Sequence, residues 1–223
     1  MENCARNQDI HLSPSLMSPE MSFVNMMKTN TDIEILSHIE TFRRDSRLKT
    51  AVFEVGGENG LDFFSFNNLF ETFLGSVAGG VMSTSRIQHS MNVTYDKNEP
   101  KIVYVQMLKP ACIEEVHHGN NFSINGKNVR CWFMTKPTQC TVIPVSSPTE
   151  VSLQRQWRFT YKNKFNYVLV QSHIGKNKNE ALTKLPKYWF RLELVKDNVI
   201  TGKSVQQLVQ SIVLKLRDVI ANE

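Results

Sequence analysis

The stretch KYWFRLELVKD, Lys187–Asp197, alternates between apolar and charged residues in its middle part. Side chains of a strand point alternately to opposite faces, so every second residue from Phe190 to Leu194 shares one apolar face. Arg191 and Glu193 share the other face. A strand as apolar as this one therefore directs a cation and a carboxylate to the same place, which is either solvent or a polar interior.

Two further stretches have a polar face of this kind. In SLQRQWRFTYK, residues 152–162, the alternation puts Arg158 and Lys162 on one face, and in KTAVFEV, residues 49–55, it sets Glu54 apart from the apolar face. A polar face that looks at solvent is the commonest state of an antiparallel sheet, and composition alone favours it. The alternative is a closed barrel with a polar interior, where carboxylates would bind a divalent metal and cations would bind phosphate.

The order of helical and strand-like patterns is typical of an α+β fold. The predicted segments are a flexible tail over residues 1–30, a helix from Thr31, a strand over 49–55, a helix after Ser65 that Gly75 ends, a run of strands over 87–194 and a last helix over 204–220. Open sheet edges are a liability, so this many strands must close or stack. We therefore expect a single domain over residues 31–223, built as a closed antiparallel β-barrel with flanking helices.

The distribution of charge favours an anionic partner. The net charge of +5 divides into −5 for residues 1–100 and +10 for residues 101–223. Nine basic residues and one acidic residue lie between positions 155 and 191. Nucleic acid, a nucleotide or a polyphosphate would suit such a surface, although a solvated basic loop around residues 175–184 would show the same composition.

Few cysteines and the lack of a signal-peptide pattern predict an intracellular protein. No apolar run approaches the roughly 20 residues that cross a bilayer, so no membrane-spanning segment is expected. A zinc site is less favoured, because no Cys-x-x-Cys pair is present among its candidate ligands, which are Cys112, His117, His118, Cys131 and Cys140. Three tryptophans lie in strands beside basic residues and could stack RNA bases, although packing under the helices is the commoner role. The last helix has a wide apolar face, which could instead form an interface between copies of the chain in an oligomer.

The order of these elements resembles the tunnel-type, metal-dependent RNA 5′-triphosphatases of mRNA capping in fungi and large DNA viruses. The likeness covers about residues 49–220 and is nearest to the N-terminal triphosphatase domains of viral capping enzymes. That family begins with a Glu-x-Glu strand followed by a helix, continues through a basic strand and ends with a second Glu-x-Glu strand and a helix. The matching stretches here are VFEVGG, QRQWRFTYK and FRLEL.

Two departures from the family pattern concern the metal ligands. The first strand keeps Glu54 but has Val52 in the place of its partner, and the last strand keeps Glu193 but has Arg191 there. The resemblance implies that Glu54 and Glu193 are the catalytic and metal-binding residues, with Mg²⁺ or Mn²⁺ as the cofactor. Two carboxylates in place of four would bind such an ion weakly.

The resemblance also implies a phosphate site made of Arg158, Lys162 and Arg191.

Three functions are open as alternatives. The first is a metal-dependent RNA 5′-triphosphatase that removes the γ-phosphate of nascent RNA, acting on an RNA 5′ end or a nucleoside triphosphate. The second is a catalytically inactive member of the fold that serves as an interaction or RNA-binding subunit, with a guanylyltransferase or an RNA polymerase subunit as partner. The third is a basic RNA-binding β-domain without a tunnel. The cytoplasm, the nucleus or a virion would be its location.

Overall fold

A computed structural model describes residues 30–84, 87–94, 104–108, 112–135, 138–139, 148–162, 165–196 and 205–221. The predicted N-terminal tail lies outside these residues, except for Asn30. No helix among the described residues has the length and apolar character needed to cross a membrane.

Helices and long strands occur in the predicted order. They are α2 (Asn30–Arg44), β1 (Leu48–Val55), α3 (Phe63–Ala78), β2 (Met82–Thr84), β3 (Gln88–Thr94), β4 (Tyr104–Leu108), β5 (Cys112–Ile124), β6 (Lys127–Thr135), β7 (Thr138–Gln139), β8 (Glu150–Tyr161), β9 (Phe165–Gly175), α4 (Lys178–Thr183), β10 (Lys187–Val195) and α6 (Val205–Ala221). The predicted α+β class with an antiparallel sheet is confirmed. The short helix α4, which Asn177 caps at its N-terminus, was not predicted.

Both predicted ends of the second helix, after Ser65 and at Gly75, differ from the structure. Asp62 caps the N-terminus of α3, where its side chain accepts a hydrogen bond of 2.9 Å from the backbone N–H of Ser65. The helix then continues through Gly75 and ends at Ala78, with Gly79 as its cap. Gly75 is exposed, and its backbone carbonyl accepts the hydrogen bond of Gly79, so this glycine is part of the last turn rather than its end.

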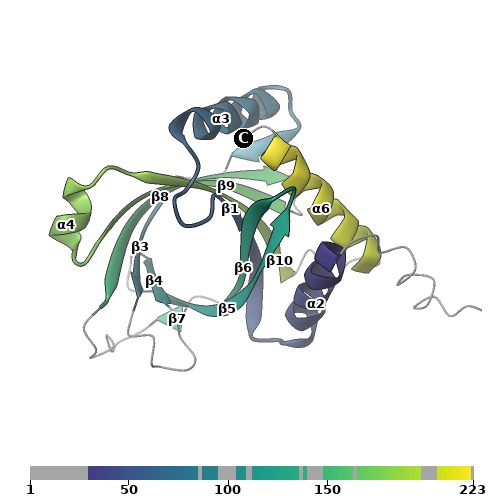
Figure 1. Cartoon of the computed structure of the whole chain (residues 1–223), viewed down its shortest axis with the longest axis horizontal. Coiled ribbons are helices and arrows are strands. Elements are labelled where there is room, and N and C mark those ends of the chain that lie inside the picture. Colours follow the sequence, from purple (N-terminus) through teal and green to yellow (C-terminus); the bar gives the residue numbers. More distant parts are fainter. Residues whose placement is uncertain are drawn as a thin grey trace, which may run out of the picture.

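The strands pair in an order that leads back to its starting point. From β8 the pairings run through β3, β4, β5, β6, β1 and β10 to β9, and all of them are antiparallel. β9 also pairs with β8 along its whole length. Figure 1 shows these strands curving around a common centre, with the helices outside. Each of these strands therefore has one face toward the centre and one face outward.

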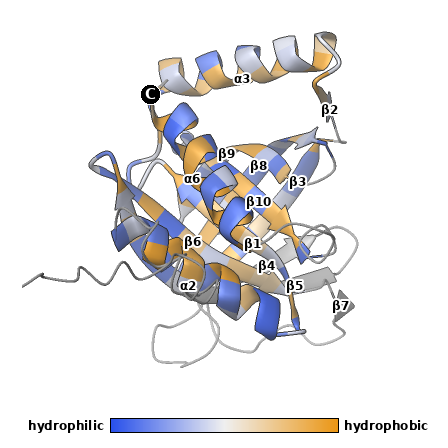
Figure 2. Cartoon of the chain, turned by 90° about the vertical axis from the view of Figure 1, so that its right-hand side faces the viewer, coloured by the Kyte–Doolittle hydropathy of each residue, from blue (hydrophilic) through white to orange (hydrophobic). Residues whose placement is uncertain are grey.

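The main apolar core lies outside the strands, under the helices. α6 packs against α2, and Figure 2 shows these two helices and α3 on the outer side of the sheet. Phe73 of α3 contacts the rings of Phe159 and Phe190 on the strands, at centroid distances of 5.4 and 6.0 Å. Leu192 and Leu194 of β10 are fully or almost fully buried in the same cluster. The apolar face of β10 therefore points outward, to the helices.

The polar face of β10 consequently points inward. Arg191 and Glu193 are 6% and 5% exposed, and Glu54 of β1 is 1% exposed, so none of them faces bulk solvent. The arrangement that composition alone favoured, a solvent-facing polar side, is wrong for these strands. Two small apolar clusters share the inner face, one around Val52 and one around Val168.

Candidate functional site

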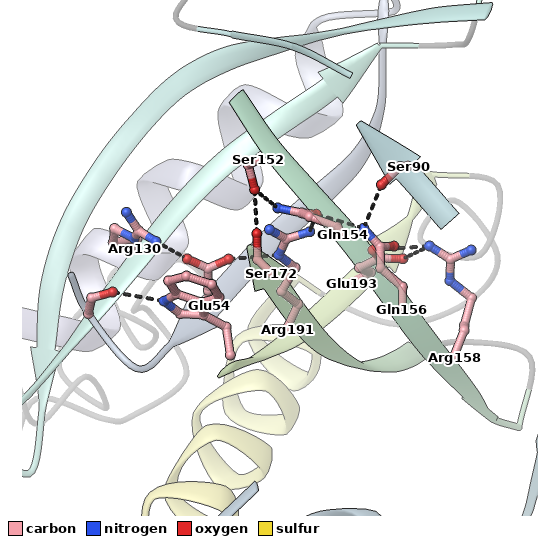
Figure 3. Close-up of polar contacts among 12 residues, drawn as sticks. Glu54, Ser90, Arg130, Ser152, Gln154, Gln156, Arg158, Ser172, Arg191 and Glu193 are labelled. Atoms are coloured by element: carbon pink, nitrogen blue, oxygen red, sulfur yellow. Dashed lines mark hydrogen bonds and ion pairs between the residues drawn. The ribbon is translucent and has the colours of Figure 1, made fainter. Parts of the chain in front are cut away.

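Glu54 lies on the inner face near the end of β1, between two arginines. The antiparallel register of β1 places Glu54 opposite Arg191 on β10 and opposite Arg130 on β6. Arg191 Nε donates to Glu54 Oε2 over 2.7 Å, and Arg130 Nη2 donates to Glu54 Oε1 (Figure 3). Direct cross-strand partners have their Cβ atoms about 5 Å apart, so backbone pairing alone brings these charges together.

Glu193 forms a second ion pair on the same face. Arg158 Nη2 of β8 lies 3.2 and 3.0 Å from the two carboxylate oxygens of Glu193. Arg158 Nη1 donates to Gln88 Oε1 on β3 over 3.1 Å. The pair therefore joins β10, β8 and β3, which are distant from one another in the sequence.

Uncharged side chains connect β10 to the opposite strands. Arg191 Nη1 reaches Gln154 Oε1 at 3.4 Å, and Gln156 Nε2 donates to the same oxygen over 3.0 Å. Gln156 Nε2 also reaches Ser90 Oγ on β3 at 3.4 Å, and Gln154 Nε2 reaches Ser152 Oγ at 3.2 Å (Figure 3). Hydrogen bonds thus continue from Arg130 on β6 to β3, and they satisfy most polar groups of a buried interior, as such groups require.

Arg191 is the most constrained cation of this network. Its guanidinium carbon lies 5.2 Å from the ring centroid of Trp132, in addition to its contacts with Glu54 and Gln154. A guanidinium on an indole face gains cation–π attraction, which is larger where water is absent. Burial of both partners makes the Glu54–Arg191 pair costly to break from one side, because the remaining charge would stay out of water.

A cavity of about 240 Å³ adjoins one side of this network. Its lining combines charged, polar and apolar side chains: Glu54, Glu58, Asn92, Thr94, Arg130, Glu150, Ser152, Gln154, Ile174, Lys187, Trp189 and Arg191. Trp189 is held in place by the hydrogen bond from its indole N–H to the carbonyl oxygen of Gly57, over 2.9 Å. The cavity therefore lies at the end of the strands where β1 ends and β10 begins.

Glu54 and Glu193 do not fit a divalent metal ion in this arrangement. All four of their carboxylate oxygens accept hydrogen bonds from arginine side chains. Among the described residues, no group of three or more His, Cys, Asp or Glu side chains could hold a metal. Mg²⁺ and Mn²⁺ need several free oxygen ligands, and positive guanidinium groups at each carboxylate oppose a second cation. The geometry therefore lends no support to the predicted metal site.

Four of the five predicted site residues come together, and the fifth does not. Glu54, Glu193, Arg158 and Arg191 share the inner face, whereas Lys162 is exposed beyond the end of β8. Lys162 has a φ of 47°, which interrupts the alternation, and its ammonium lies over a tyrosine ring at 5.3 Å from the centroid. The predicted common face of Arg158 and Lys162 is therefore wrong.

Arg130 is the main site residue that the sequence analysis missed. The stretch VRCWFMT alternates, and β6 directs Arg130, Trp132 and Met134 to one face. The same alternation that selected Arg191 could have selected Arg130. The serines and Gln88 have no comparable sequence signal, since isolated hydroxyl and amide side chains occur on any strand.

The zinc alternative has little support in the described part of the chain. Cys131 is buried in the outer apolar core, where burial raises the pKa of its thiol to about 12. A thiol held neutral in this way is a poor metal ligand. The other four candidate side chains lie outside what the structure describes.

Comparisons with known proteins agree with this architecture. The triphosphatase of the Mimivirus capping enzyme superposes with a TM-score of 0.60 at 10% identity, and the match covers 87% of this chain and 99% of that one. The chain has the fold of the tunnel-type RNA triphosphatases. The tunnel fold is seen again in the Pct1 RNA triphosphatase of S. pombe, with a TM-score of 0.59 at 7% identity over 86% of this chain and 93% of that one. Neither a family model nor a curated protein matches the sequence.

Proposed function

We propose that this chain is a non-hydrolysing member of the tunnel fold, which serves as an RNA-binding subunit of an mRNA-capping or transcription assembly. The ring of strand pairings would form the closed tunnel of that fold. One observation carries the proposal: every carboxylate oxygen of Glu54 and Glu193 accepts a hydrogen bond from an arginine.

The arginines provide the charge compensation that a metal would otherwise provide. Arg191 occupies the position where the family pattern has a second glutamate, and it neutralises Glu54 directly across the strand pair. Val52 occupies the other missing position and offers no ligand atom. A divalent metal needs several free oxygen ligands, and two carboxylates already paired with guanidinium groups offer none.

An RNA-binding role is supported by the charge of the second half of the chain. The exposed cations of this half include Arg155, Lys162, Lys176, Lys178 and Lys184. Lys184 is partly offset by its ion pair with Glu180, at 2.6 Å. Such a surface attracts phosphate groups without sequence preference and loses affinity as salt rises. Protein partners are proposed as well: Pct1 has been solved in complex with the Spt5 CTD, and a guanylyltransferase or RNA polymerase subunit would be the corresponding class here.

The second candidate is the metal-dependent RNA 5′-triphosphatase. It is favoured by the likeness to triphosphatase structures and by the placement of Glu54 and Glu193 on the same inner face. For this activity an ion would have to displace arginines from both carboxylates.

Phosphate release separates the two candidates. The full chain would be incubated with triphosphate-ended RNA, and separately with ATP, in Mg²⁺ and in Mn²⁺, beside a Glu54→Ala/Glu193→Ala variant. We expect no release above that of the variant, and binding of RNA that is equal in EDTA and in Mg²⁺ when measured by fluorescence anisotropy. Metal-dependent release that the double substitution abolishes would show that the chain is an enzyme and would overturn the proposal.

A further inference from the structure

The loop that joins β1 to α3 lies at the end of the strands that borders the cavity. This lid loop, residues 56–61, begins two positions after Glu54. Glu58 in its middle lines the cavity together with Lys187 and Trp189 of β10. In Figure 1 the loop descends from α3 to the edge of the ring of strands. A movement of the lid loop would therefore change access to the cavity.

Both ends of the lid loop are fixed, and they lie close together. The backbone N–H of Leu61 donates to the carbonyl oxygen of Tyr188 on β10 over 2.6 Å, and Leu61 is 4% exposed. At the other end, a Cβ added to Gly56 would lie 3.1 Å from the backbone nitrogen of Leu61. Compact loops whose ends meet in this way are Ω-loops, which are frequently functional. The middle of the loop can thus move while both ends stay in place.

The middle of the lid loop, which consists of Gly57, Glu58 and Asn59, is only lightly packed. Glu58 and Asn59 are exposed, and a Cβ added to Gly57 would meet no heavy atom of the described chain within 4 Å. On either side, Gly56 and Gly60 have φ values of 122° and 80°, which residues with a Cβ rarely adopt. Small residues at the ends of a segment commonly act as its hinges.

Two hydrogen bonds from β10 hold the middle of the lid loop against the strands. The indole N–H of Trp189 donates to the carbonyl oxygen of Gly57 over 2.9 Å, and Lys187 Nζ donates to the carbonyl oxygen of Glu58 over 3.2 Å. Both donors also line the cavity. An ammonium group binds a phosphate oxygen more strongly than an uncharged carbonyl oxygen, because both partners are then charged. A phosphate group in the cavity would therefore compete with the loop for Lys187.

The charges around the cavity favour this competition. Arg130 and Arg191 share the single carboxylate of Glu54, which leaves net positive charge beside the cavity, and the Arg130 side chain is 37% exposed. The other two carboxylates of the lining, Glu58 and Glu150, are exposed, so solvent screens them. Glu58 belongs to the lid loop itself, so opening of the loop would also carry this negative charge away from an entering anion.

We propose that the lid loop opens when a phosphate group takes Lys187 from the carbonyl oxygen of Glu58. The inference deepens the proposed RNA-binding function and rests on it for the class of ligand, which is a phosphate-bearing RNA end. In the closed state Lys187 and Trp189 hold the loop. In the open state Lys187 binds the phosphate, and the indole of Trp189 loses its bond to Gly57. A ligand shifts such an equilibrium because it binds the open state better than the closed one.

The indole N–H of Trp189 reports the state of the lid loop. Its exchange with solvent would be measured by NMR on the ¹⁵N-labelled full chain in EDTA, with Trp189→Phe to assign the signal. Lys187→Met should speed this exchange about fivefold, the change expected from the loss of one hydrogen bond. The backbone amide of Leu61 belongs to the fixed end and should exchange as before. Cleavage after Glu58 by a glutamyl endopeptidase is the second readout and should also accelerate.

Two matched variants isolate the contact of Lys187. Glu58→Gln removes the protease site but keeps the carbonyl oxygen that Lys187 uses, so indole exchange in the free protein should stay that of the wild type. Lys178→Met removes an exposed cation of α4 that makes no bond to the lid loop, and it should alter neither readout. Unchanged exchange and cleavage in folded Lys187→Met would refute the closed contact.

Three ligands test the opening step in EDTA. An RNA with a 5′-triphosphate should speed cleavage after Glu58 in the wild-type chain, the same RNA with a 5′-hydroxyl should not, and neither should speed it further in Lys187→Met. An equal effect of inorganic tripolyphosphate would support the proposal with phosphate alone as the trigger, whereas an effect of the RNA only would support it with the RNA end as the trigger. No acceleration by the triphosphate-ended RNA would overturn the proposal.

Failure of the proposed function would appear separately. It would be seen as metal-dependent phosphate release in Mg²⁺ or Mn²⁺, whereas the measurements on the lid loop are made in EDTA, where no such release occurs.

Discussion

The Glu54–Arg191 pair gives the most direct test of whether the charged side chains of the interior neutralise one another. Arg191→Met keeps the length and apolar volume of the side chain but removes the charge, and Glu54 then retains only Arg130, whose side chain is 37% exposed. Removing one partner of a buried pair costs about 3–5 kcal/mol. We expect about 2–3 kcal/mol here, since one guanidinium remains at the carboxylate. Glu54→Gln should cost a similar amount, because Arg191 is then left buried without its counter-charge.

The double substitution should cost no more than either single one. Glu54→Gln/Arg191→Met removes both charges together, and the amide oxygen at position 54 can still accept from Arg130. Urea unfolding followed by tryptophan fluorescence would give the four free energies of the double-mutant cycle. We expect a coupling energy of about 2–3 kcal/mol between the two substitutions. The slope of the unfolding free energy against urea concentration should be the same in all four proteins.

A surface pair provides the control. Arg44→Met removes an arginine that is 82% exposed and lies 3.6 Å from Glu40, an i,i+4 pair for which about 0.3–0.5 kcal/mol is expected. The reasoning is refuted if Arg191→Met costs no more than Arg44→Met. It is also refuted if the two interior substitutions simply add, since additivity would mean that the charges do not depend on each other.

Three further outcomes follow from the structure. Burial lowers the pKa of His38 to about 4, whereas the imidazole of the unfolded chain binds its proton near pH 6.5. The free energy of unfolding should therefore fall by up to about 3 kcal/mol as the pH drops between these two values. Urea unfolding at several pH values would measure this dependence, which His38→Leu should flatten. Gly60→Ala would place a Cβ 2.6 Å from a backbone oxygen of β10, so calorimetry should give it a lower Tm than Gly57→Ala, which has a positive φ but no neighbour within 4 Å. Val52→Glu/Arg191→Glu completes two facing pairs of carboxylates, and Mn²⁺ should raise the Tm of this variant but not that of the wild-type protein.

Sequence alternation identified the two faces of each strand but not which face was internal. In β10 the period of two separates Arg191 and Glu193 from the apolar residues, and the structure keeps that separation. Whether the charged face meets solvent depends on how the other strands pair and on which side the helices pack. Those contacts join residues more than a hundred positions apart, as in the pairing of Glu54 with Arg191, so no local pattern contains them.

Errors occurred where a strand or helix ends. Lys162 has the spacing of an inner-face residue, but β8 ends at Tyr161, and a left-handed backbone conformation turns the chain away. Gly75 has the composition of a helix stop, but packing of α3 on the strands carries the helix to Ala78. Tertiary packing overrides the local preference of glycine in this case, because Phe73 and the partly buried Val77, on either side of it, pack against the core.

The placement of the apolar core means that the fold does not depend on a metal in the interior. Stability comes mainly from the outer cluster under α2, α3 and α6, so the inner face must only keep its buried charges paired. A glutamate at position 191 would face Glu54 across the strand pair, and two such carboxylates need a cation between them. Arginine at this position supplies that positive charge from the chain itself. Arg191 therefore both forms the ion pair and opposes a second cation at Glu54, and a metal ligand at position 191 would remove the positive charge that now balances this carboxylate.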